Sequence, residues 1–351
     1  MKSKLIGLLI ILLIITGCSK KEPEGDLIIH SYDTSSYPVA IPFEPSKLRY
    51  FHHARNALDI GLHMIEHSKV HFATSKYVLH EGSILREYGS DLLALVNRNS
   101  DSNPTGLNPS ATTVFDIGNN KTVEGPVIIN DVFEINFREI NQPNKLAALT
   151  LALVVRSRIN DDKGNLVTID SEKLYAFATN AGRALASYFQ GLPGVFDIPI
   201  CILIYDDSSI DNGLPGSVIA EGLFTGRTGQ FTPIEQSQAF VPTDLASSKD
   251  KQLYNQFVNL KRSLLGFLPE NVSIIGKATY HQNQATKLKI TITVMAKTYP
   301  EIYVLNEYLI SLLKEFPEEV LIIVEIKNYE NTLIVLRKEA DSNQINKIIL
   351  D

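Results

Sequence analysis

The sequence predicts an α+β fold in which antiparallel sheets pack against helices on one side. Apolar residues alternate with lysine and threonine over 287–294, as expected for a strand with one buried and one hydrated face. The segment after it predicts a helix that covers the apolar face, because its apolar residues recur three and four positions apart, at Ile302, Leu305, Leu309, Leu312 and Phe316. Short turns between successive strands favour antiparallel pairing.

The chain starts with the pattern of a secretory signal peptide over residues 1–17. Lys2 and Lys4 precede an apolar run over 5–15. This run is shorter than the about 20 apolar residues that a membrane-spanning helix needs. The leader therefore favours export over a permanent transmembrane anchor.

A lipobox is predicted at the end of this leader. Ile15, Thr16 and Gly17 precede Cys18 in the order that signal peptidase II recognises, so Cys18 is the expected lipidation site. An ordinary signal peptide with a chance cysteine is the alternative. Acyl chains on Cys18, palmitate among them, would hold the mature chain on the extracytoplasmic face of the cell membrane.

Residues 18–45 are rich in Lys, Glu, Ser and Pro, and we expect a flexible tether there. The formal charge is −6, and removing Lys2 and Lys4 lowers it to −8. A nucleic-acid partner is not expected, because no basic footprint remains. Cys201 is the other cysteine besides Cys18, and the apolar residues around it in 197–205 predict a buried thiol.

Residues 46–125 predict a helical segment followed by a loop. The first helix has an apolar stripe that we expect to be buried, formed by Phe51, Ala54, Leu58, Leu62 and Ile65. A short strand over 76–85 and a helix over 86–96 follow. Residues 97–113 predict an ordered surface loop, because proline and glycine interrupt regular structure there.

Three residues of the first helix fit the H-x-x-E-H pattern of inverted zinc peptidases. His63 and His67 would bind the ion, and Glu66 would act as the general base. At 100° per residue, however, both imidazoles point away from the predicted apolar stripe, towards solvent. Three alternatives stand: a zinc peptidase, adventitious or regulatory metal binding, and a polar helix face. We expect the polar face, with no metal ligand, no cofactor and no catalytic residue.

The same order of elements occurs twice, which predicts two related ββαβ halves over 126–245 and 246–351. The turns share Asn-Gln-x-x-Lys-Leu at 141–146 and 283–288. The first copy has strands over 133–140, 146–157 and 197–205 and a helix over 171–190; the second has strands over 273–280, 288–297 and 320–327 and a helix over 300–316. A strand near 217–224 and a helix over 249–267 lie between them. Unrelated α+β folds share such an order, so a chance match remains the alternative.

Several colinear motifs resemble the CamS family of sex-pheromone lipoproteins. They are the lipobox ending at Cys18, NPTGLNP over 103–109, DIPI over 197–200, LPG over 214–216 and GKATYHQNQATKLKITITV over 276–294. The resemblance implies an exported lipoprotein whose leader, after cleavage before Cys18, is trimmed to a hydrophobic peptide pheromone. In this chain the corresponding peptide is 10–17.

The sequence therefore predicts a non-catalytic surface lipoprotein with a possible pheromone leader. The alternative is a binding module for a peptide, glycan or protein partner, because loops on a rigid scaffold often carry recognition. Its candidate binding residues come from two loops and are Asn103, Pro104, Gly106, Asn108, Pro109, Leu214, Pro215 and Gly216. A cavity that joined the two loops would favour this alternative.

Overall fold

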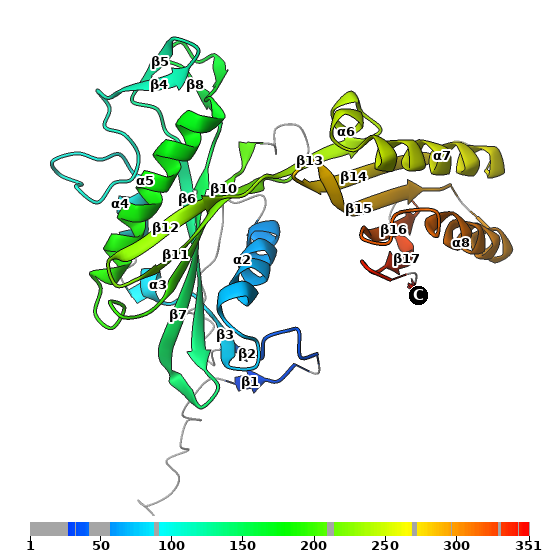
Figure 1. The fold of residues 1–351 in the computed structure, drawn as a ribbon, viewed down its shortest axis with the longest axis horizontal. Helices are drawn as coiled ribbons and strands as arrows, with labels where there is room; N and C mark the ends of the chain where they lie inside the picture. The colour runs from blue at the N-terminus through cyan, green and yellow to red at the C-terminus, as the bar shows by residue number, and fades with distance from the viewer. Residues whose placement is uncertain are drawn as a thin grey trace, which may run out of the picture.

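In a computed structural model of the chain, the described residues are 27–31, 33–41, 57–87, 91–208, 214–268, 272–295, 297–328, 331–342 and 344–350. They form two large β-sheets that lie one after the other along the chain, and two short hairpins (Figure 1). Helices cover both faces of the first sheet and one face of the second. No helix within this part of the chain has the length and hydropathy to cross a membrane.

The first sheet has eight strands in a mixed arrangement. Their spatial order is β1 (Leu27–Ile29), β2 (Val39–Ile41), β3 (Tyr77–Glu81), β6 (Ile129–Glu139), β7 (Gln142–Val155), β10 (Ile200–Asp206), β11 (Ser217–Thr225) and β12 (Thr228–Pro233). The pairs β2/β3 and β7/β10 are parallel and the other pairs are antiparallel. Two hairpins extend beyond it: β4 (Val114–Gly118) with β5 (Lys121–Glu124), and β8 (Arg158–Asn160) with β9 (Leu166–Thr168).

Both faces of this sheet are packed. On one face α5 (Ser171–Gln190) buries Leu174, Leu185 and Phe189 against the sheet. On the other face α2 (Ala57–His71) buries Ile60 and Met64. Strand β10 is fully covered as a result, which explains why its sequence is apolar at successive positions. Burial of each such large aliphatic side chain contributes about 1.5–3 kcal/mol.

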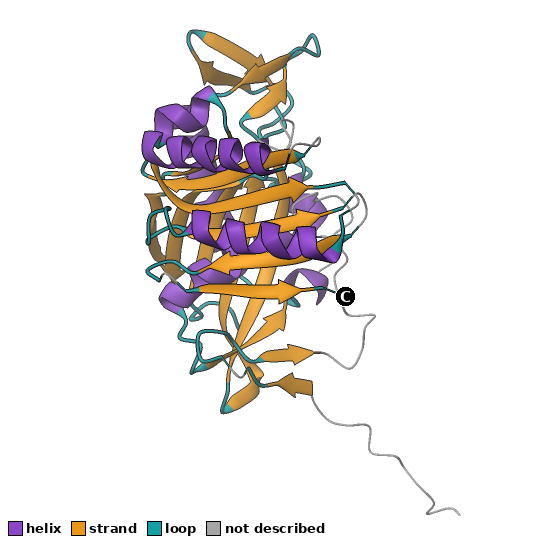
Figure 2. Ribbon diagram, turned by 90° about the vertical axis from the view of Figure 1, so that its right-hand side faces the viewer, coloured by secondary structure: helices purple, strands orange, loops and turns teal. Residues whose placement is uncertain are grey.

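The second sheet has six strands in the order β13 (Gln236–Val241), β14 (Ser273–His281), β15 (Gln284–Thr293), β16 (Leu321–Lys327), β17 (Thr332–Lys338) and β18 (Ile345–Ile349). Only β15 and β16 pair in parallel. The helices α7 (Lys251–Phe267) and α8 (Tyr299–Leu313) both lie on one face of it (Figure 2). Short helices complete the fold: α3 (Ile84–Glu87), α4 (Asp91–Val96) and α6 (Asp244–Lys249).

The α+β class is confirmed, with two corrections. The sheets are mixed rather than antiparallel, since a helix crossing over a sheet face returns the chain parallel to the strand it left, as α5 does between β7 and β10. Helices lie on one side of the second sheet but on both sides of the first. Both sheets contain an antiparallel hairpin, a crossover helix and a parallel strand in this order; an origin by duplication stays a prediction.

Two expected segments differ in the structure. The tether predicted over 18–45 is wrong for the described residues 27–31 and 33–41, because β1 and β2 are part of the first sheet. Tyr37 fixes this region: it is 5% exposed and its hydroxyl donates to the carbonyl of Phe72. The second sheet begins with β13 at Gln236, ten residues before the predicted boundary at 246.

Candidate functional site

A cluster of polar side chains lies between α2 and the first sheet. Three histidines of the helix are spaced four residues apart, so they share one face: His63, His67 and His71. Their side chains are 18–20% exposed, because this face turns towards β10 and β11. The cluster is thus half-buried at the contact between helix and sheet.

Glu221 of β11 lies opposite two of these histidines. Nδ1 of His67 donates to Oε2 over 2.5 Å, and Nε2 of His71 donates to Oε1. Burial opposes ionisation of Glu221, but the two hydrogen bonds outweigh it and hold the pKa of the carboxyl below its ordinary range. A carboxylate with both oxygens paired to imidazoles can therefore stay charged at this depth.

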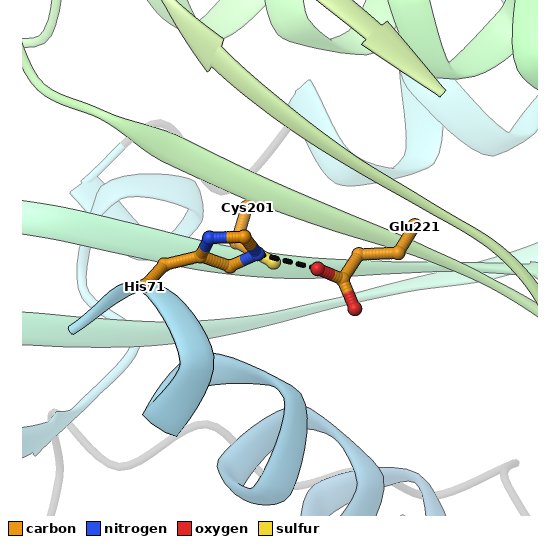
Figure 3. A group of neighbouring side chains, drawn as sticks. All are labelled: His71, Cys201 and Glu221. Carbon is orange, nitrogen blue, oxygen red and sulfur yellow. Dashed lines mark hydrogen bonds and ion pairs between the residues drawn. The ribbon is translucent and has the colours of Figure 1, made fainter. Parts of the chain in front are cut away.

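Cys201 is the third member of the cluster and lies in β10 of the first sheet. Its side chain is fully buried, and it pairs in register with Thr150 of β7. Burial raises the pKa of the thiol, and the nearby Glu221 carboxylate raises it further. The ligand atoms of His71, Cys201 and Glu221 all lie within 4.8 Å of one another (Figure 3). Imidazole, thiol and carboxylate are the groups that bind transition metals.

A second polar pair joins the helix to the sheet beside the cluster. Ser68 is fully buried, and its Oγ lies 2.6 Å from Oγ1 of Thr150.

Towards the start of the helix, the hydroxyl of Tyr205 donates to Oδ2 of Asp59 over 2.7 Å, and Nε2 of His63 lies 3.6 Å from the same oxygen. Burial lowers the pKa of His63, and the Asp59 carboxylate only partly offsets this.

The predicted orientation of this helix is wrong for Leu58 and Leu62, although Ile65 of the same stripe packs against the core. Leu58 is 79% exposed and Leu62 is 52% exposed, whereas His63 and His67 face the sheet. The sheet surface explains the difference, because it offers Glu221 and Thr150 as polar partners. The helix therefore buries Ile60, Met64 and Ser68 together with its imidazoles. Phe51 and Ala54 lie outside the described residues.

Glu66 is not part of the cluster. Its side chain is 64% exposed and forms an ion pair with Lys69 over 2.8 Å. The structure thus separates the expected base from His67, whose carboxylate partner is Glu221. The arrangement that the H-x-x-E-H pattern predicts, two imidazoles with Glu66 at one zinc ion, is not formed.

Sequence reasoning missed His71, Glu221 and the proximity of Cys201 to both. Two signals could have indicated them. His71 continues the four-residue spacing of the histidines, and Glu221 is a lone carboxylate in the otherwise apolar strand 218–224. Their meeting depends on the pairing of β10 with β11, which no local pattern encodes.

The loop over 103–109 is held together by its own polar groups. Asn108 is 1% exposed; its Nδ2 donates to the carbonyls of Val96 and Ile129, and its Oδ1 accepts from the amides of Ile128 and Ile129. Asn103 donates to the carbonyls of Ala94 in α4 and of Arg98 after it. These expected binding residues act at least as structural anchors.

Backbone contacts fix the other residues of the two candidate loops. The carbonyl of Pro104 accepts from Asn99, and that of Pro109 lies 3.5 Å from Nη1 of Arg98. A Cβ at Gly106 would lie 2.5 Å from the Arg98 backbone. At the second loop Leu214 and Pro215 are half-buried, and a Cβ at Gly216 would lie 2.3 Å from the Asp206 carbonyl and the Tyr205 ring.

The two candidate loops do not share the nearest cavity. Asn103 and Asn108 line a cavity of about 610 Å³ beside α4 to which Leu214, Pro215 and Gly216 do not contribute. The predicted lipobox residues Ile15, Thr16, Gly17 and Cys18 lie outside the described part of the chain.

The chain is thus an α+β protein with two mixed sheets in tandem. A model of the family described as CamS sex pheromone cAM373 precursor matches residues 47–344, and the chain belongs to this family. The comparison with curated protein sequences gives no match.

Two solved structures have the same fold. One is a crystal structure of a sex pheromone precursor from Lactobacillus salivarius subsp. salivarius UCC118, with a TM-score of 0.77 and 19% identity, covering 93% of this chain and 99% of that chain. The other is the C-terminal domain of the sex pheromone staph-cAM373 precursor from Staphylococcus aureus, with a TM-score of 0.69 and 18% identity, covering 84% and 96%.

Proposed function

We propose that this chain is a lipid-anchored protein of the extracytoplasmic membrane face, with Cys18 as the acylated residue. The observation that carries the proposal is the leader over 1–17 ending in Ile15, Thr16 and Gly17 before that cysteine, in a member of a pheromone-precursor family. Two or more acyl chains hold a protein on a membrane where one does not, so anchorage needs no spanning helix.

The leader is the proposed source of a peptide pheromone. After cleavage before Cys18, residues 10–17 form an uncharged, mainly aliphatic peptide. Such a peptide suits an apolar receptor pocket. Support comes from the family and from the two structural relatives, both described as pheromone precursors.

The proposed role of the folded body is non-catalytic. Glu66, the general base of the alternative peptidase function, is exposed and pairs with Lys69. The Glu221 carboxylate is occupied by two imidazoles. These contacts support a binding or structural role for the cluster.

Mass spectrometry of the membrane fraction and the culture supernatant tests both parts. Acylated Cys18 is expected in the membrane, and peptides from 10–17 in the supernatant. Cys18→Ala should release the protein from the membrane, whereas the control Ser31→Ala should not. Membrane retention of Cys18→Ala would refute anchorage; acylation without a released peptide would refute only the pheromone part.

A cavity at one end of the first sheet favours a second candidate function, the binding of a small polar ligand that carries an anionic group. It has a volume of about 690 Å³ and lies beyond the carboxyl ends of the parallel strands β7 and β10, where ligand sites of α/β sheets commonly lie. Its lining carries both charges: Arg98, Arg156 and Arg158 lie beside Glu124, Asp161, Asp162 and Asp207. Nε of Arg156 is 3.5 Å from Oδ1 of Asp207. Guanidinium groups bind carboxylate and phosphate in a bidentate manner.

Thermal unfolding of the protein with inorganic phosphate or citrate tests this candidate. Either anion should raise the melting temperature, and Arg156→Ala should reduce the increase. Arg183→Ala is the matched control, because Arg183 is an exposed arginine of α5. An increase of equal size in both variants would assign the effect to general salt stabilisation instead.

A further inference from the structure

We propose that His71, Cys201 and Glu221 bind a zinc ion and that His67 positions Glu221 for this role. The donor atoms come from α2, β10 and β11, and all lie within 4.8 Å of one another (Figure 3). A tetrahedral zinc ion has bonds of about 2.0–2.3 Å, which places its donors roughly 3.5 Å apart. To admit the ion, the hydrogen-bonded donor atoms of His71 and Glu221 move apart, while the Cys201 sulfur keeps or shortens its distance of at most 4.8 Å to them.

The hydrogen bonds of the cluster describe its metal-free state. They account for Glu221, whose two oxygens accept from His67 and His71. The Cys201 thiol is buried beside them and hydrogen-bonds with Thr150, and its sulfur also lies within 4.8 Å of both the His71 and the Glu221 donor atoms. Three different metal-binding groups from three elements converge on one point, and a metal site explains all three together.

The donor set selects zinc among the common divalent cations. Thiolate and imidazole are poor ligands for calcium and magnesium, which prefer sets made of oxygen. Zinc accepts sulfur, nitrogen and carboxylate oxygen together. Cys201 as thiolate and Glu221 as carboxylate cancel the two positive charges of the ion. A neutral site avoids the cost of burying a net charge beneath α2.

Zinc binding requires defined proton movements. Cys201 loses its thiol proton to solvent and binds as the thiolate. The proton that Nε2 of His71 donates to Glu221 is exchanged through solvent for one on Nδ1, so the ring stays neutral and Nε2 binds the ion. Oε1 of Glu221 exchanges that hydrogen bond for the metal. No bond in the protein is broken and no redox change is involved.

His67 acts through Glu221. Its Nδ1 donates to Oε2, the oxygen that is not paired with His71, so it holds the carboxylate while Oε1 turns to the ion. Hydrogen bonds of this kind orient metal ligands, and their loss typically lowers affinity about 10–100-fold. The side chains of His71 and Glu221 are 19% and 17% exposed, which gives an ion a path from solvent and leaves a coordination position for water.

Metal content of the full chain, purified in detergent, tests the proposal. After incubation with zinc sulfate and dialysis, elemental analysis should give one zinc per chain. His71→Ala, Cys201→Ser and Glu221→Gln should each lose most of this zinc, and His67→Ala should weaken binding about tenfold or more. His281→Ala is the matched control, because His281 is an exposed histidine of β14 outside the cluster.

Cobalt substitution of the unaltered protein provides a second test, which needs no variant and so is not affected if a variant fails to fold. A tetrahedral site with a thiolate should give intense visible bands and a sulfur-to-cobalt charge-transfer band, and Cys18→Ala should keep both. Zinc at 100 times its Kd should also lower the unfolding constant of the protein about a hundredfold. No stoichiometric zinc, or a cobalt spectrum without the charge-transfer band, would overturn the proposal. Equal zinc in His71→Ala and His281→Ala would mean adventitious binding and would overturn it as well.

Discussion

His67 and Glu221 are 154 positions apart in the sequence, yet Nδ1 of the imidazole lies 2.5 Å from Oε2 of the carboxylate. His71 forms a second hydrogen bond with the same carboxylate. The two bonds attach α2 to the first sheet through Glu221. The cost of burying the carboxylate is offset by two hydrogen bonds from imidazoles. The polar contact fixes which side of the helix faces the sheet.

Glu221→Gln should destabilise the metal-free protein by about 1–3 kcal/mol, because an amide nitrogen cannot accept a hydrogen bond from the second imidazole. Urea unfolding in the presence of a chelator measures the change. Glu66→Gln is the control: its exposed side chain pairs with Lys69, so a change below about 0.5 kcal/mol is expected. Equal losses of unfolding free energy in the two variants would contradict the role of Glu221 as the acceptor of two imidazole hydrogen bonds.

Gly216→Ala should destabilise the protein by about 1–3 kcal/mol, because the added Cβ would lie 2.3 Å from the Asp206 carbonyl. Gly266→Ala should have the opposite effect. Nothing lies within 4 Å of a Cβ at this position of α7, and alanine favours a helix by up to about 1 kcal/mol over glycine. Thermal unfolding of both variants measures the contrast. Unchanged or increased stability of Gly216→Ala would show that the contact at Gly216 is relieved at no cost.

Asn108→Asp should cost about 2–4 kcal/mol, because a carboxylate cannot donate to the carbonyls of Val96 and Ile129. The loop over 103–109 should open, and amide hydrogen exchange of Ile128 should accelerate. Asn346→Asp, at an exposed position of β18, should leave stability nearly unchanged. Normal exchange at Ile128 in the Asn108 variant would be inconsistent with this role.

Glu325 should make the stability of the second sheet depend on pH. Burial raises its pKa, but Lys289 at 2.7 Å and Lys327 at 3.1 Å outweigh this, so the folded pKa lies below its ordinary value. The stabilisation is present above the unfolded pKa, about 4.3, and is lost as the pH falls through the folded value. Its size is up to about 1 kcal/mol.

Urea unfolding between neutral pH and pH 3 measures this dependence. Between pH 5 and pH 3, the unaltered protein should lose more stability than Glu325→Gln. The exposed residue Glu315 provides the control, and Glu315→Gln should follow the unaltered protein. Parallel curves for Glu325→Gln and the unaltered protein would contradict the prediction.

Elements with strong local signals could be predicted from the sequence. The helix predicted over 171–190 has these bounds in the structure, because Asp170 caps its first turn by accepting from the amide of Glu172. The apolar run around Cys201 correctly predicted a buried strand. In both cases neighbouring residues in the sequence carry the information.

The orientation of α2 could not be predicted in the same way. A stripe that includes Leu58 and Leu62 predicts burial only if the opposing surface is apolar, and here that surface carries Glu221 and Thr150. The partners of His67 and Ser68 come from strands more than 80 residues away. Which face of a half-polar helix is buried is therefore decided by tertiary contacts.

The incorporation of β1 into the first sheet limits how far the protein could reach from a bilayer. With the proposed acyl chains on Cys18, only residues 19–26 separate the lipid from Leu27, where β1 begins. Even a fully extended chain of this length covers at most about 30 Å. The folded body would then remain close to the lipid headgroups, and any partner would have to approach the membrane surface to meet it.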